Sequence, residues 1–180
     1  ALIGLLTGAI SFGQLSTEQK VADFRHLAGL YAKQYAPYEW KLAVQRFDLL
    51  DLGGWLERVR ATRDDLDFYD LMIEYVARLN DAHDVYTLPS SFSASLGFTV
   101  DIYDGKVLVD SISRTRLPAS EYPFQIGDEL ISVDGRDVES LIAELSKYST
   151  AANPRSTRRA AAGRITTRPQ SRIPRAIEVG

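Results

Sequence analysis

The sequence predicts an α+β fold in which a helical N-terminal part is followed by a part that contains β-strands. Between residues 16 and 80, apolar residues recur every three or four positions, which is the spacing of one helix face. From residue 98, apolar and polar residues alternate, as they do along a half-buried strand. Apolar residues make up 45% of the 180 residues and charged residues 25%, so a wholly disordered chain is excluded.

The first twelve residues carry no charge and are almost wholly apolar. They resemble the hydrophobic region and small-residue end of a secretory signal peptide that lacks its basic start. They are too few for a membrane-spanning helix, which needs about 20 residues, so no stable membrane span is expected. We expect residues 1–15 to be an apolar leader or signal-peptide remnant, and the protein to be exported, periplasmic or extracellular. The alternative is an N-terminal helix that is buried or covered by a partner.

Residues 16–94 are predicted to form a helical subdomain. Ser16 and Gln19 have capping-box spacing at the start of a helix over about 17–35. Shorter helices are expected at 38–47 and 55–61, and a fourth is expected to start at Asp64 or Asp65 and to end near Asn80. The inward stripe of the first helix should consist of Val21, Phe24, Ala28, Tyr31 and Tyr35.

The strongest β signal is a hairpin around Asp104-Gly105, a dipeptide suited to a two-residue turn with positive φ angles. Such a turn sets Ile102 opposite Val107 and Val100 opposite Val109. The apolar residues then meet on one face, so the turn and the hydrophobic pattern predict the same register.

The rest of the chain is predicted to contain one further β region, two helices and a final strand. The β region runs over 126–133 and turns at Asp134-Gly135. Asp137 is expected to cap a helix that reaches about residue 148. A short helix over 157–164 and a strand over 176–179 should follow. The serine-rich stretch 90–95, preceded by Pro89, is interpreted as a linker.

The charged residues indicate neither a metal site nor a paired-carboxylate active site. His83 lies between Asp81 and Asp84, but two further ligands are not evident, so local hydrogen bonds at a helix end are favoured. Asp64, Asp65 and Asp67 fall at a helix start, where acids favour the positive end of the dipole. The chain has no cysteine, which excludes disulfides and thiolate chemistry. No cofactor is expected.

Charge is distributed unevenly along the chain. Residues 151–180 hold seven arginines and one acid, a net charge of +6, against −9 for residues 1–150. This arginine-rich segment contains no aromatic residue on which a base could stack, so nucleic-acid binding is not expected. A solvated helix face, together with contacts to acidic surface elsewhere in the same chain, is favoured.

The segment 127–135, Gly-Asp-Glu-Leu-Ile-Ser-Val-Asp-Gly, resembles the Gly-Asp-x-Ile-x-x-Val-Asn-Gly segment of PDZ domains. Together with the preceding Ser95-Leu96-Gly97-Phe98 loop and the hairpin, it is similar to a circularly permuted PDZ domain of the bacterial type. The resemblance implies a PDZ-like β-barrel or sandwich with flanking helices over 95–180. It also implies that the final strand takes the place of the first strand of the animal form.

A PDZ domain implies a groove for the C-terminal peptides of other proteins. Leu96, Gly97 and Phe98 would supply backbone donors for the terminal carboxylate, as glycine-containing loops can. Thr99 and Val100 would pair with the peptide backbone. Val138, Leu141 and Ile142 would line a side-chain pocket on the helix that forms the other wall. Without the resemblance, Gly97 would mark only a strand entry that allows close packing.

The helical part is similar to the carboxyl-terminal processing, or tail-specific, serine peptidases. The similar segments are Tyr-Ala-Pro-Tyr-Glu-Trp-Lys at 35–41 and Leu-Asn-Asp-Ala-His-Asp at 79–84, although Asp84 stands where many relatives have threonine. The resemblance implies proteolysis of captured C-termini by a downstream catalytic domain with a serine nucleophile. No match to that nucleophile motif is present, so we expect no catalytic residue and no activity in these 180 residues.

The predicted function is therefore substrate recognition for a C-terminal processing serine peptidase, through peptide binding at the PDZ groove. The downstream catalytic domain of the same protein would be a partner, and homo-oligomers are possible. The alternative is a non-catalytic PDZ adaptor, a protein-interaction module without a peptidase.

Overall fold

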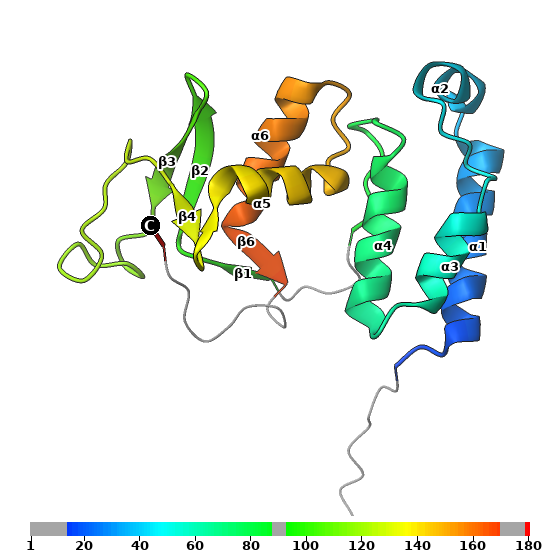
Figure 1. The fold of residues 1–180 in the computed structure, drawn as a ribbon, viewed down its shortest axis with the longest axis horizontal. Coiled ribbons are helices and arrows are strands. Elements are labelled where there is room, and N and C mark those ends of the chain that lie inside the picture. Colours follow the sequence, from blue (N-terminus) through cyan, green and yellow to red (C-terminus); the bar gives the residue numbers. More distant parts are fainter. Residues whose placement is uncertain (1–13, 88–92, 170–178) are drawn as a thin grey trace, which may run out of the picture. The chain divides into compact units, whose positions relative to one another are not determined.

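The computed structural model describes residues 14–87, 93–169 and 179–180. The chain divides into two compact units, Ala1–Leu71 and Met72–Gly180 (Figure 1). The division falls inside helix α4 (Asp65–Ala77) and not in the serine-rich stretch. Most of the predicted leader and most of the predicted final strand lie outside the described residues.

The first unit contains the predicted helices α1 (Thr17–Gln34), α2 (Tyr38–Gln45) and α3 (Gly53–Arg60). The capping box of α1 is present, with the Gln19 N–H donating to Ser16 Oγ at 3.2 Å and the Ser16 N–H donating to Gln19 Oε1 at 2.8 Å.

Aromatic rings join the helices of this unit. The predicted inward stripe of α1 is confirmed in part: Phe24 and Ala28 are fully buried, whereas Val21, Tyr31 and Tyr35 are half-buried. The Trp55 ring of α3 stacks on Phe24, with 6.2 Å between ring centroids, and meets Phe47 edge-on at 6.4 Å. Because Trp55 contacts both rings, α1, α3 and the segment after α2 share one apolar cluster.

A buried ion pair links α1 to the start of α4. The Lys20 ammonium lies 3.3 Å from Asp65 Oδ1, and the Lys20 side chain is only 6% exposed. The Asp65 carboxylate also accepts the Leu15 N–H at 3.1 and 3.2 Å. Asp65 therefore neutralises a buried lysine and holds the chain at the entry to α1.

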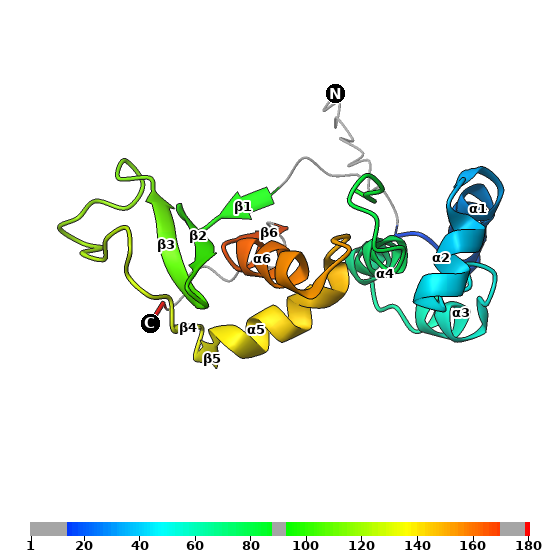
Figure 2. The ribbon, with the colours of Figure 1, turned by 90° about the horizontal axis from the view of Figure 1, so that it is seen from above.

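The described residues of the second unit form three antiparallel strand pairs, whose strands are labelled in Figure 2. The central pair is β2 (Phe98–Tyr103) with β3 (Lys106–Ile112). The other pairs, which are shorter, are β1 (Ser93–Ser95) with β6 (Thr167–Pro169), and β4 (Ser132–Val133) with β5 (Arg136–Asp137). The sequence did not predict β1 or β6.

The predicted hairpin register is confirmed. Val100 pairs with Val109, Ile102 with Val107, and both turn residues have positive φ, 49° at Asp104 and 84° at Gly105. A β-bulge between Thr99 and Val100 shifts the register by one residue toward the start of β2.

The β region predicted over 126–133 is only partly regular. β4 is two residues long, and Leu130 approaches β3 by donating its N–H to the Val107 carbonyl at 2.8 Å. The Val109 N–H donates to the Asp128 carbonyl at 2.8 Å. Gly127 has a φ of 94°, so the chain turns there and pairs with β3 over a short stretch only. Val179, the one described residue of the predicted final strand, bridges to Val133 of β4.

Two helices complete the second unit, α5 (Val138–Leu145) and α6 (Pro154–Ile165), joined through the 3₁₀ turn Ser146–Tyr148. As predicted, Asp137 caps α5 by accepting the Ser140 N–H at 2.9 Å. α6 starts three residues before its predicted start, because Asn153 accepts the Ser156 N–H at 2.9 Å and Pro154 occupies the first turn.

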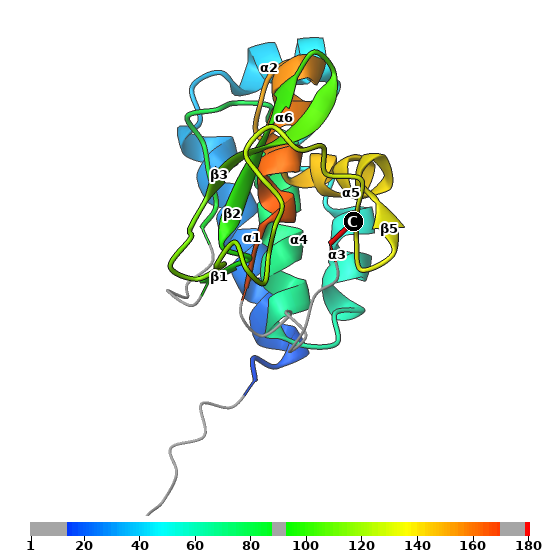
Figure 3. The same ribbon diagram turned by 90° about the vertical axis from the view of Figure 1, so that its left-hand side faces the viewer.

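One apolar cluster forms the core of the second unit. It joins residues from β2, β3, α5, α6 and the segment around β4. Its members are Phe98, Val100, Val107, Val109, Leu130, Val133, Val138, Leu141, Ile142, Ala161, Ala162 and Ile165. Figure 3 shows α6 beside β2, with α5 beyond it. Both helices therefore close the same side of the hairpin.

We expect Asp65→Ala to destabilise the protein by about 1–3 kcal/mol, because it leaves the buried Lys20 ammonium without its counter-charge. Chemical denaturation followed by circular dichroism measures the loss. Lys20→Met in the Asp65→Ala background should recover part of it by removing the stranded charge. A double variant that is no more stable than Asp65→Ala would contradict the ion-pair interpretation.

A candidate peptide groove beside strand β2

The outer edge of β2 is the feature of the second unit that can receive another strand. Tyr103 and Lys106 flank a two-residue turn, so they form a hydrogen-bonded pair, and such pairs alternate along an antiparallel ladder. Tyr103 and Asp101 therefore bond toward β3. At the other end, the Gly97 carbonyl accepts the Ser113 N–H at 2.8 Å, so Gly97 also bonds to the β3 side.

This alternation directs the backbone N–H and C=O groups of Phe98, Val100 and Ile102 away from β3. Beyond the bulge, the same parity directs the Thr99 backbone toward its partner Ser111, whose Oγ lies 2.7 Å from Thr99 Oγ1. Of the two residues predicted to pair with a peptide backbone, Val100 has its groups on the open edge. Thr99 does not, because β3 already uses them.

The helix that lies along this edge is α6. The Arg159 guanidinium of α6 forms a bidentate ion pair with Asp101 of β2, in which Nε donates to Oδ1 at 2.7 Å and Nη2 donates to Oδ2. At the other end of α6, the Thr166 carbonyl accepts the Leu96 N–H at 3.0 Å. The helix thus contacts the strand near both ends of the groove.

The predicted pocket residues Val138, Leu141 and Ile142 lie on α5, and the structure corrects their placement. They are 4–6% exposed and belong to the core cluster together with Phe98 and Val100. The reason is helix composition: α6 presents mainly alanines to the core, so the larger side chains of α5 fill the remaining volume. The helix beside β2 has small buried residues, Ala161 and Ala162, and comes close to the strand.

In the loop predicted to bind a carboxylate, two of the three expected backbone donors already have partners. The Leu96 N–H donates to Thr166, and the Gly97 N–H donates to Ser95 Oγ at 3.1 Å. The Phe98 N–H faces the open edge. Because a serine hydroxyl can rotate away from a backbone amide, the Gly97 N–H can be released more readily than the Leu96 N–H.

The segment after β3 supports this loop from outside. Leu117 lies under Gly97, so that a Cβ added to Gly97 would be 3.0 Å from Leu117 Cδ1. Arg116 donates from Nη2 to the Ser95 carbonyl at 2.8 Å, which places an exposed cation beside the loop. No sequence pattern pointed to Arg116, because this residue lies 21 positions from Ser95 and comes beside the loop only after β3.

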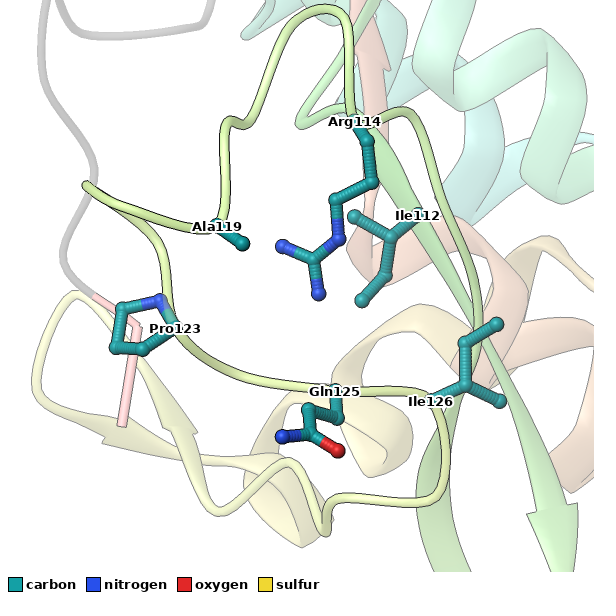
Figure 4. A pocket seen from close by; sticks show the side chains of 6 residues that line it. All are labelled: Ile112, Arg114, Ala119, Pro123, Gln125 and Ile126. Carbon is teal, nitrogen blue, oxygen red and sulfur yellow. The ribbon is translucent and has the colours of Figure 1, made fainter.

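A hollow of about 440 Å³ lies on another side of the unit, within the loop that follows β3 (Figure 4). Arg114 crosses this loop and donates to the carbonyls of Leu117 at 3.3 Å, Tyr122 at 2.8 Å and Phe124. None of the residues lining the hollow belongs to β2 or α6, so it is separate from the candidate groove. Its lining residues are Ile112, Arg114, Ala119, Pro123, Gln125 and Ile126.

The arginines of α6 contact acidic residues of the same chain, as the charge asymmetry suggested. Besides the Arg159–Asp101 pair, Arg158 donates from Nη2 to Glu139 Oε1 at 2.5 Å. The hydrogen bond from Arg159 lowers the pKa of Asp101 below its usual value, and the Ile102 N–H, which donates to Asp101 Oδ1 at 2.8 Å, acts in the same direction.

Two further expectations concern metals and membranes. His83 makes the predicted local contacts, because its N–H donates to Asp81 Oδ1 at 3.1 Å and its Nδ1 lies 3.2 Å from the same oxygen. Over the described ranges, no group of three or more potential metal-ligating side chains comes together. Within the same ranges, every helix is too short or too polar to cross a membrane.

Comparison with known proteins agrees with this architecture. Residues 92–179 match the family model of the PDZ domain. No curated protein sequence matches the chain. The second unit therefore carries a PDZ domain, and the chain as a whole has an α+β fold.

The fold is similar to that of solved CPAF structures. Mature CPAF is 23% identical with a TM-score of 0.74, and the match covers 91% of this chain and 31% of CPAF. Mature CPAF complexed with lactacystin is 24% identical with a TM-score of 0.70, and the match covers 84% of this chain and 29% of CPAF. A CPAF mutant is 24% identical with a TM-score of 0.75, and the match covers 91% of this chain and 31% of the mutant chain. At these identities the likeness concerns the fold, and the chain spans less than a third of the CPAF chains.

Gly97→Ala should lower the free energy of unfolding by about 1–3 kcal/mol, because a φ of 90° is strained for any L residue and the added methyl group contacts Leu117. The matched control is Gly163→Ala in α6, where an added Cβ has no neighbour within 4 Å. That change should raise stability by up to about 1 kcal/mol. Denaturation midpoints of both variants test the pair. A Gly97→Ala protein as stable as the parent would show that this loop tolerates a side chain.

The Asp101 carboxyl should titrate below the ordinary aspartate pKa of about 3.9. Since its folded pKa is lowered, its contribution to stability is complete above the unfolded value and disappears as the pH falls through the folded one. Carboxyl chemical shifts from an NMR titration measure this pKa. Arg159→Met should return the value toward the ordinary range, whereas Arg155→Met, on the same helix, should leave it lowered.

Proposed function

We propose that the PDZ domain binds the C-terminal peptides of other proteins by adding them as a strand to the outer edge of β2. The observation that carries this proposal is the edge itself. Phe98 and Val100 direct their backbone groups away from β3 and toward the side on which α6 lies. Strand addition to such an edge takes its affinity from main-chain hydrogen bonds.

The peptide terminus would lie at the Leu96–Phe98 end of the groove. Two backbone donors are suited to a carboxylate there: the outward N–H of Phe98, and the N–H of Gly97 once the Ser95 hydroxyl rotates. Arg116, anchored to the Ser95 carbonyl, adds a positive charge beside them. An apolar terminal side chain would then face the α6 surface.

The parent protein is proposed to be a serine peptidase of the carboxyl-terminal processing type, in which this module captures substrates for a downstream catalytic domain. The fold likeness to CPAF, a serine protease, and the helical segments at 35–41 and 79–84 support this proposal. Export to the periplasm or the extracellular space belongs to the same proposal and rests on the apolar residues 1–12. A PDZ adaptor without a peptidase is the alternative that the groove serves equally well.

The test compares a peptide ending in a free apolar residue with the same peptide carrying an amidated end. A hydrogen bond to a charged group contributes roughly 1.5–3 kcal/mol, so the free acid should bind on the order of tenfold more tightly or better. Calorimetric titration of the full chain measures both affinities. Equal affinity for the acid and the amide would exclude a carboxylate site at this loop.

Arg116→Met provides a second measurement on the same pair of peptides. It should reduce the preference for the acid and leave the affinity for the amide unchanged, because it removes charge and keeps the length of the side-chain stem. Arg155→Met, an exposed arginine on α6, is the matched control and should change neither affinity. A preference for the acid that survives Arg116→Met intact would remove Arg116 from the proposed site.

A further inference from the structure

The outer edge of β2 is not open along its whole length. The Ile102 N–H, which the ladder directs outward, donates to Asp101 Oδ1 at 2.8 Å. A carboxylate from the preceding residue therefore caps the strand edge at the position where a third peptide hydrogen bond would form. Within the described part of the chain, no such cap lies at Phe98 or Val100.

This cap is held in place from across the groove. Arg159 of α6 donates hydrogen bonds to both oxygens of the Asp101 carboxylate, from Nε to Oδ1 at 2.7 Å and from Nη2 to Oδ2. Bidentate arginine–carboxylate pairs fix geometry as well as charge. The Asp101 side chain is only 18% exposed, although Arg159 is 69% exposed, so the carboxylate lies in a sheltered position at the strand edge.

The opposite end of the groove is also tied, by the Leu96 N–H and the Thr166 carbonyl at 3.0 Å. Between the two ties, the described residues with outward backbone groups are Phe98 and Val100. These two residues are roughly 7 Å apart along a strand. A peptide that paired with both would use about three or four of its own residues, and a longer one would meet the Arg159–Asp101 pair in its path.

We propose that the Asp101–Arg159 pair is a latch that ends strand addition at Val100 and thereby restricts the ligand to a short peptide terminus. The proposal rests on the proposed function, because it concerns the same groove. It assigns a specificity role to two side chains: the latch selects a short C-terminal segment over a long extended segment. Opening the latch would free the Ile102 N–H and lengthen the edge.

The experiment uses the full chain and two peptides with the same four apolar C-terminal residues, one four and the other eight residues long, the added residues being uncharged. In the parent protein, both peptides should bind with affinities within about twofold. In Asp101→Ala and in Arg159→Met, the octapeptide should bind on the order of fivefold more tightly than the tetrapeptide. This difference in affinity corresponds to about one added backbone hydrogen bond. Arg155→Met should behave like the parent.

A second measurement needs no ligand. Amide hydrogen exchange at Ile102 should be slow in the parent and faster by roughly tenfold or more in Asp101→Ala, because the cap is gone. Unchanged exchange at Ile102 would overturn the latch whether or not peptides bind. The latch would also be overturned if the affinity of the octapeptide relative to the tetrapeptide were the same in the parent and in both variants. Failure of every peptide to bind, with Ile102 exchange still accelerated, would instead overturn the proposed function and the ligand restriction while leaving the cap itself established.

Discussion

The two-residue turn at Asp104-Gly105 fixes how β2 pairs with β3, and the candidate site depends on that register. With positive φ at both turn positions, the flanking residues Tyr103 and Lys106 become a hydrogen-bonded pair. The pairs as far as Val100–Val109 then follow by alternation, and the bulge before Val100 shifts the remaining pairs of β2 by one residue. The same register places Phe98 and Val100 on the core face and directs their backbone groups to the outer edge, so core packing and the binding edge have one common cause.

The composition of α6 decides what can lie beside that edge. Ala161 and Ala162 are fully buried against the core, and such small side chains let the helix approach the strand closely. Two arginines of the same helix form ion pairs with neighbouring elements: Arg159 pairs with Asp101 of β2, and Arg158 pairs with Glu139 of α5. Part of the positive charge of this segment is therefore neutralised within the second unit.

The PDZ domain and the fold likeness to CPAF define an architecture, and an architecture does not define a function by itself. The proposed function depends on particular groups: the outward amides of Phe98 and Val100, the releasable amide of Gly97 and the cation of Arg116. These groups can bind a carboxylate and a short extended chain.

The sequence by itself determined the features that depend on neighbouring residues. The capping box of Ser16 and Gln19, the stripe of α1, the Asp104-Gly105 turn and the cap at Asp137 all involve partners within a few positions or across one tight turn. Such local signals do not depend on the rest of the fold, and they were sufficient to predict the hairpin and its register.

Only the tertiary structure decided which helix faces β2 and which donors of the loop are free. The apolar pattern of α5 is expected of a groove wall, but the same pattern is expected of a core helix. Because the buried alanines of α6 leave volume in the core, that volume is filled by Val138, Leu141 and Ile142. The partners of the site are also distant in sequence: Asp101 and Arg159 are 58 positions apart, and Ser95 and Arg116 are 21 positions apart. Hydrophobic periodicity records that a side chain is buried but not what it is buried against, so these contacts became visible only once the chain had folded.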